Sequence, residues 1–160
     1  MVTLIFCRYK LLSCFVFLCM ICFPVLVRAD ADRKLSSRET LYVPVYSNIY
    51  AGPKAVPHQL ATMLSIHNID PGSSITILKA DYYDSNGKFI ESYIKTPISL
   101  KPFTHTFIYL KEYDKRGGPG ANFIVKWRAS KNVNQPIVEA LMYGSRAGLS
   151  FTSSGQIITE

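Results

Sequence analysis

From residue 40 to its end, the chain alternates short runs of β-branched and aromatic residues with turn-forming residues, roughly every ten positions. The expected strands are Thr40–Tyr46, Gln59–Asn68, Ser74–Asp84, Lys88–Lys95, Thr104–Lys111, Ala121–Arg128, Pro136–Tyr143, Leu149–Thr152 and a last short one at Gln156–Ile158. No segment keeps an apolar period of about 3.6 over three turns, so few helices are expected. This pattern predicts an all-β fold, namely an immunoglobulin-like antiparallel β-sandwich of about 7–9 short strands.

The direction of side chains can be predicted where apolar and polar residues alternate, because successive side chains of a strand point to opposite faces. In the run from 123 to 128, Phe123, Val125 and Trp127 are expected to point inward, while Lys126 and Arg128 point to water. The same rule, applied to the run from 74 to 84, puts Thr76, Leu78, Ala80 and Tyr82 on one face.

A hairpin is predicted at residues 84–88, where Asn86 and Gly87 separate two strand-like runs. Asn-Gly favours a two-residue turn with positive φ at both central residues, which matches the twist of the flanking strands. The hairpin would join the run ending at Asp84 to the run beginning at Lys88.

The N-terminal part of the chain has a different character, because the 17 residues of Leu11–Val27 include no charged side chain. Basic residues flank this run, with Arg8 and Lys10 before it and Arg28 after it. A positive flank followed by an apolar stretch and small residues is typical of a secretory signal peptide. We therefore expect an exported protein, periplasmic or at the cell surface.

Signal peptidase cleavage could follow Ala29 or Ala31, since both end a small-residue site. The alternative is an uncleaved anchor in the inner membrane, because residues 11–27 just reach the length of a spanning helix. The expected organisation is a signal peptide or anchor at 1–29, a flexible polar lead at 30–39 and a single β-sandwich domain at 40–160. Membrane contact is expected only through the N-terminal segment, if it is uncleaved.

Removal of the signal segment would change the composition of the chain. It would take with it all four cysteines, Cys7, Cys14, Cys19 and Cys22. It would also remove three of the 18 Lys and Arg residues and no acid, leaving 15 basic against 11 acidic side chains. A mature domain without cysteine must hold its fold by packing alone, and a net charge of +4 does not call for a nucleic-acid partner.

The residues needed for common catalytic and metal sites do not form recognisable motifs. The three histidines, His58, His67 and His105, are not at metal-ligand spacing, so no metal is expected. The serine of the segment 144–148 directly follows the glycine, which is the wrong spacing for a nucleophile elbow. No glycine-rich nucleotide motif precedes a helix, and no cofactor is predicted. We expect no catalytic residues, and an enzyme is the alternative of the two functional hypotheses given below.

The candidate binding residues centre on a glycine-rich segment. They are Gly117, Gly118, Gly120, Asn122, Trp127, Glu139 and Tyr82. Glycines can bind an anion through backbone N–H groups, but a tight loop that enters the following strand explains them at least as well. Glu139 is a single acid in an apolar run, so an inward orientation would require a partner such as Arg128 or Lys126. Asp81 and Glu91 could face each other across the predicted hairpin as an acid/base pair, or simply be two solvated residues.

Several segments together resemble the bacterial exported family called domain of unknown function 3124. They are Tyr42–Ser47, Asp81–Asp84, Gly117–Trp127, Val133–Met142 and Leu149–Ser153 followed by Gly155. The resemblance extends from Leu41 to Ile158 and implies a bacterial protein outside the cytoplasm. It implies no activity, because the family has no assigned function.

Two functional hypotheses follow. The first is a non-catalytic binding or structural module of the periplasm or cell envelope, with an envelope protein or glycan as partner. The alternative is a small extracytoplasmic hydrolase acting on an envelope glycan. Such an enzyme would need a cleft that joins Glu139, Asp81 or Asn122 with carboxylates at a productive separation.

Overall fold

The computed structural model describes residues 34–145 and 148–159, and this part of the chain is all-β, with twelve strands and no helix. The predicted signal segment at 1–29 lies outside the described residues. Within the described ranges there is no helix long and apolar enough to cross a membrane. The prediction of an all-β fold is confirmed.

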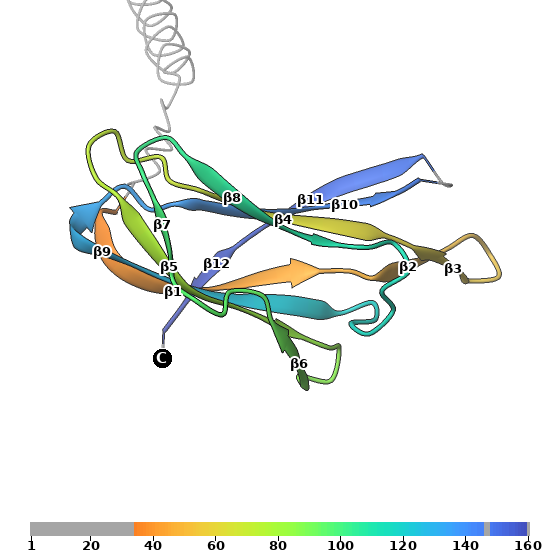
Figure 1. Ribbon diagram of the computed structural model, residues 1–160. Helices are drawn as coiled ribbons and strands as arrows, with labels where there is room; N and C mark the ends of the chain where they lie inside the picture. The colour runs from red at the N-terminus through yellow and green to blue at the C-terminus, as the bar shows by residue number, and fades with distance from the viewer. Residues whose placement is uncertain (1–33, 146–147, 160) are drawn as a thin grey trace, which may run out of the picture. The chain divides into compact units, whose positions relative to one another are not determined.

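The strands form antiparallel sheets in two layers and one short separate hairpin (Figure 1). The first sheet has the order β12-β1-β9-β5-β6, with β7 also paired to β5. The second has the order β11-β10-β4-β8, and β2 pairs with β3 alone. The bounds are β1 Ser36–Val45, β2 Asn48–Ala51, β3 Val56–Gln59, β4 Ala61–His67, β5 Ile75–Tyr83, β6 Phe89–Ser92, β7 Ile98–Leu100, β8 His105–Leu110, β9 Ala121–Val133, β10 Ile137–Gly144, β11 Leu149–Ser154 and β12 Gln156–Ile158.

The two larger sheets bury their facing side chains in one apolar cluster. From β9, the residues Phe123, Val125 and Trp127 are at most 1% exposed, as their alternation with polar neighbours predicts. Leu64 and Ile66 of β4 come from the other sheet and are fully buried. Burial of each such side chain contributes about 1.5–3 kcal/mol, so this shared core holds the two layers together without any disulfide from the described residues.

The predicted face of β5 is wrong because the strand contains a β-bulge. Ile77 pairs with Trp127, whereas the next partner of β9, Lys126, pairs with Lys79, so Leu78 has no partner. Ile77 is therefore buried before the bulge, and Ala80 and Tyr82 are buried after it. An extra residue in one strand reverses the direction of every following side chain relative to simple alternation.

The predicted hairpin at residues 84–88 joins β5 to β6, but its turn differs from the expected type. Gly87 has a φ of 77°, whereas Asn86 is not among the residues with positive φ. The amide of Gly87 donates to the carbonyl of Asp84 at 3.0 Å, and the Asp84 amide donates to the carbonyl of Lys88 at 2.9 Å. A turn closed by one left-handed glycine allows the chain to reverse with a register shift between Tyr82 and Tyr83.

Three of the strands are not predicted by the sequence pattern, and β1 and β9 are longer than it predicts. The short strands β2 and β3 pair only with each other, and β7 lies in the proline-containing passage from 96 to 103. Strand β1 starts at Ser36 rather than at Thr40, because Ser36 pairs with Val133 at the extended end of β9. Polar residues of low strand propensity can join a sheet when a partner strand is present.

The two lateral edges of the fold are built differently. At one edge, the chain passes from β11 of the four-stranded sheet to β12 of the six-stranded sheet through Gly155. A β-carbon on Gly155 would lie 3.1 Å from the carbonyl oxygen of Val138, so only glycine fits this crossing without a shift of its neighbours. The other edge is formed by β6 and β8, and the loop from 111 to 120 runs beside it. This edge holds the candidate site.

Candidate site between the edge strands β6 and β8

A single arginine organises the loop that follows β8. The Arg116 guanidinium donates to both carboxylate oxygens of Asp114, with Nε–Oδ1 and Nη2–Oδ2 distances of 2.9 and 2.7 Å. The Arg116 amide also donates to Asp114 Oδ1, at 3.1 Å. This local arrangement is an Asx-type turn reinforced by a bidentate ion pair, which fixes both the backbone and the side chain of Arg116.

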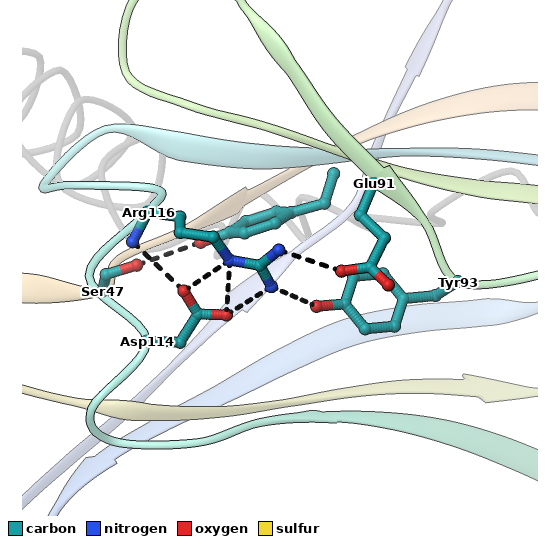
Figure 2. Close-up of polar contacts among 6 residues, drawn as sticks. Ser47, Glu91, Tyr93, Asp114 and Arg116 are labelled. Carbon is teal, nitrogen blue, oxygen red and sulfur yellow. Dashed lines mark hydrogen bonds and ion pairs between the residues drawn. The ribbon is translucent and has the colours of Figure 1, made fainter.

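The same guanidinium connects the loop to the segment around β6. Its Nη1 donates to Glu91 Oε2 at 3.0 Å, and its Nη2 donates to the phenolic oxygen of Tyr93 at 3.2 Å (Figure 2). Arg116 and Glu91 are 25 residues apart in the sequence. Arg116 therefore links two carboxylates and a tyrosine from two separate segments into one polar network.

Electrostatics keep this network charged. Hydrogen bonds from Arg116 hold the pKa of Asp114 below its ordinary value, and Asp114 together with Glu91 raises the pKa of Arg116. The pKa of Tyr93 is raised, mainly by desolvation and then by the charge of Glu91. The network therefore has an ionised Asp114 and a neutral Tyr93 at pH 7, and Asp114 is a poor general acid at that pH.

A shallow groove of about 450 Å³ runs beside this network. Its polar lining includes Glu91, Asp114 and Arg116, and its aromatic lining is Tyr93, Tyr109 and Tyr113. Tyr113 is 73% exposed and Tyr109 is 47% exposed. Tyr109 also accepts a hydrogen bond of 3.3 Å from the hydroxyl of Tyr143 on β10, which ties the edge strand β8 to the interior of its sheet. The groove thus combines exposed aromatic rings with ion-paired polar groups.

The glycine-rich loop, predicted as a candidate binding element, is occupied by contacts within the protein. The carbonyl of Gly117 accepts hydrogen bonds from the amide and the hydroxyl of Ser85, at 2.9 and 2.8 Å. The Ser85 hydroxyl in turn accepts from the amide of Gly120 at 2.9 Å. The carbonyl of Gly118, which has a φ of 75°, accepts from the amide of Ser47 at 3.0 Å. These bonds fasten the loop to the β5–β6 turn and to the end of β1.

Tyr82 belongs to the same anchoring region. Its ring is fully buried, packs on Phe123 with ring centroids 4.9 Å apart, and its hydroxyl lies 3.0 Å from Oγ of Ser47. Desolvation raises the pKa of Tyr82. The structure therefore brings Tyr82 together with Gly117, but as a packing contact below the groove.

The other candidate residues are dispersed. Trp127 is 1% exposed in the core, and its indole Nε1 has no hydrogen-bond partner among the described residues. Asn122 is buried at the start of β9, where it pairs with Pro44 and Tyr83. Glu139 alternates with the buried Val138 and Ala140, so it lies on the outer face of the four-stranded sheet and not toward Arg128 or Lys126, which belong to the other sheet.

Of the two interpretations of Asp81 and Glu91, the strand register contradicts the acid/base pair. Asp81 pairs with Ser92, whereas Glu91 pairs with Tyr82 on the opposite face of the strand pair. Asp81 forms an ion pair with Lys79 at 3.0 Å, and Glu91 forms one with Arg116. The register shift at the end of the hairpin, which sequence spacing does not reveal, separates the two acids.

The sequence pattern does not indicate the residues that line the groove, and it offers Glu91 only as a partner of Asp81. The signal that was present is local: Tyr109, Tyr113, Asp114 and Arg116 lie within eight residues, in and just after an edge strand. Loops that carry aromatic and charged residues together often bind ligands. Glu91 and Tyr93 could not be assigned to this site without the pairing of β6 in the sheet.

Comparisons with known proteins give the family but no activity. No curated protein matches the chain significantly. A solved structure from Thermotoga maritima, described as "Crystal Structure of Thermotoga maritima 1070", is similar with a TM-score of 0.43 and 9% identity, over 76% of this chain and 96% of that one. The family described as "Protein of unknown function (DUF3124)" matches residues 38–158, and the chain belongs to this family.

Proposed function

We propose that this protein is an exported, non-catalytic binding module that holds a glycan of the cell envelope in the groove between β6 and β8. The observation that carries the proposal is the combination of the exposed rings of Tyr109 and Tyr113 with the polar network around Arg116. Tyrosine presents an apolar face and a polar hydroxyl, which suits ligands that are themselves amphipathic. A sugar ring has such a character, with C–H groups on one face and hydroxyls at its edge.

The network also supports binding over catalysis. Arg116 already holds Glu91 and Asp114 in fixed positions, so their oxygens can accept hydrogen bonds from ligand hydroxyl groups without a cost for ordering the two side chains. The lowered pKa of Asp114 makes it a poor proton donor at neutral pH. In addition, the hydrolase alternative needs a cleft around Glu139, Asp81 or Asn122. Glu139 lies on the outer face of the four-stranded sheet, whereas Asp81 and Asn122 belong to the six-stranded sheet.

The proposal has two further parts, the fold type and the export of the chain. The two facing antiparallel layers support an immunoglobulin-like sandwich as the fold type. Export rests on the sequence from 1 to 31. Sequencing of the N-terminus after cell fractionation is expected to begin at residue 30 or 32, whereas an intact chain in the inner membrane would show an anchor instead.

The binding proposal is tested by calorimetric titration of the full chain with oligosaccharides prepared from bacterial cell wall. Tyr113→Ala and Tyr109→Ala should each weaken binding by about tenfold, the loss expected for an aromatic side chain at the centre of a contact. Tyr50→Ala is the matched control, because Tyr50 is 60% exposed on β2, outside the groove. Equal affinity of all four proteins, or no binding of any oligosaccharide, would contradict the proposal.

A further inference from the structure

Two histidines that are far apart in the sequence stand next to each other in the four-stranded sheet. His67 of β4 and His105 of β8 are register partners, and their ring centroids lie 5.1 Å apart with planes 15° from parallel. His67 alternates with the buried Ile66, so the pair lies on the outer face of the sheet, away from the core. His105 is exposed and His67 is half-buried, which leaves the pair accessible from solvent.

This arrangement suits a metal ion that prefers imidazole ligands. Residues directly opposite on antiparallel strands have β-carbons roughly 4.5–5.5 Å apart, so two such imidazoles can reach a common ion once their rings rotate out of the stacked arrangement. Neutral imidazole binds zinc, copper and nickel ions, whereas magnesium and calcium prefer oxygen ligands. The strands also fix both backbones, which reduces the entropy lost when the ion binds.

We propose that His67 and His105 form a two-histidine site for a divalent transition-metal ion. Among the described residues, no group of three or more His, Cys, Asp or Glu side chains is arranged to hold a metal, so water would complete the coordination. Glu139, on the same outer face, pairs with Ser65, two positions from His67 along β4. Its negative charge favours a cation nearby. The site is separate from the groove and does not depend on the function proposed for it.

The test is titration of the full chain with NiCl₂, CuCl₂ or ZnCl₂, followed by calorimetry. Cys7, Cys14, Cys19 and Cys22 are replaced by serine in every protein so that thiolates do not compete. One ion should bind per chain, and His67→Ala or His105→Ala should weaken binding by at least about tenfold, since even the loss of a ligand's partner commonly costs that much. His58→Ala is the matched control, because His58 lies on β3 in the separate hairpin.

The outcomes separate a metal site from a mere ring stack. Binding that is unchanged in His67→Ala and His105→Ala, or reduced equally by His58→Ala, would overturn the proposal. Equally strong binding of Mg²⁺ or Ca²⁺ would also overturn it, because imidazole does not favour those ions. Circular dichroism establishes that each variant is folded, and the electron paramagnetic resonance spectrum of the copper complex should show nitrogen ligands that His67→Ala and His105→Ala each reduce.

Discussion

The hydroxyl oxygen of Tyr82 fills the space that a side chain on Gly117 would need, and a β-carbon built on that glycine would lie 1.9 Å from it. The two residues are 35 positions apart, on β5 and in the loop before β9. Gly117 directly follows Arg116. This close approach therefore fixes how near the loop of residues 111–120, which carries Arg116, lies to the core.

Replacing Gly117 by alanine should therefore destabilise the protein by overpacking. The new methyl group would also lie 2.7 Å from Cβ of Ala121, and clashes of this kind typically cost about 1–3 kcal/mol in the free energy of unfolding. Gly120→Ala is the control, because its β-carbon would meet Ser85 Oγ at an ordinary 3.6 Å. Urea unfolding curves measure both. A Gly117→Ala protein as stable as Gly120→Ala would show that the loop moves freely.

The hydrogen bond between Tyr82 and Ser47 should appear as a coupling energy in a double-mutant cycle. Both groups are buried, so Tyr82→Phe or Ser47→Ala leaves the remaining hydroxyl without its partner. The double variant should be more stable than the sum of the two single losses predicts, by about 1 kcal/mol. Chemical denaturation of the four proteins gives this value, and strict additivity would mean that the bond contributes nothing.

Acid should destabilise the protein through Asp70, whose pKa is lowered to about 2 by amide hydrogen bonds from Asn134 and Gly72. A carboxyl group whose pKa is lower in the folded state stabilises the fold above its unfolded pKa, near 4. That stabilisation is lost as the pH falls from about 4 to about 2. In thermal melts, Asp70→Asn should have a lower Tm at pH 6, and its Tm should fall less than that of the natural protein between pH 5 and pH 2.5. Parallel pH profiles would contradict this role.

Arg116 should control the ionisation of Asp114. Arg116→Gln removes the guanidinium that holds the pKa of Asp114 low, so this pKa should rise toward its ordinary value. The side chains of Arg116 and Glu91 are 49% and 41% exposed, and such exposed ion pairs contribute at most about 1 kcal/mol, whereas the side chain of Asp114 is only 16% exposed. Carbon-13 NMR titration of the carboxyl groups measures the shift. An unchanged Asp114 pKa would show that the ion pair is absent in solution.

Local sequence rules predicted the parts of this fold that depend on near neighbours. The inward direction of Phe123, Val125 and Trp127 was predicted correctly, because alternation persists along the regular part of β9. The rule failed in β5, where one extra residue at Leu78 shifts the phase. A bulge is a property of two paired strands, so a single strand does not reveal it.

In the candidate site, too, the sequence predicts local features but not contacts between distant segments. The tight glycine-rich loop was one of two interpretations made from the sequence, and the structure supports it through Ser85 and Ser47. Ser85 reaches that loop from 32 residues away, and Glu91 reaches Arg116 from 25 residues away. Neither distance in sequence suggests a contact.

By itself, the sequence determined an all-β chain of short antiparallel strands and its family, because period, turn chemistry and motifs are carried by consecutive residues. Only the tertiary structure decided that Arg116 joins Glu91, Tyr93 and Asp114 beside a tyrosine-lined groove, and that His67 meets His105. These juxtapositions depend on strand register and on the packing of two sheets. Strand register depends on contacts between residues that are far apart in the sequence, so no local pattern of side chains specifies it.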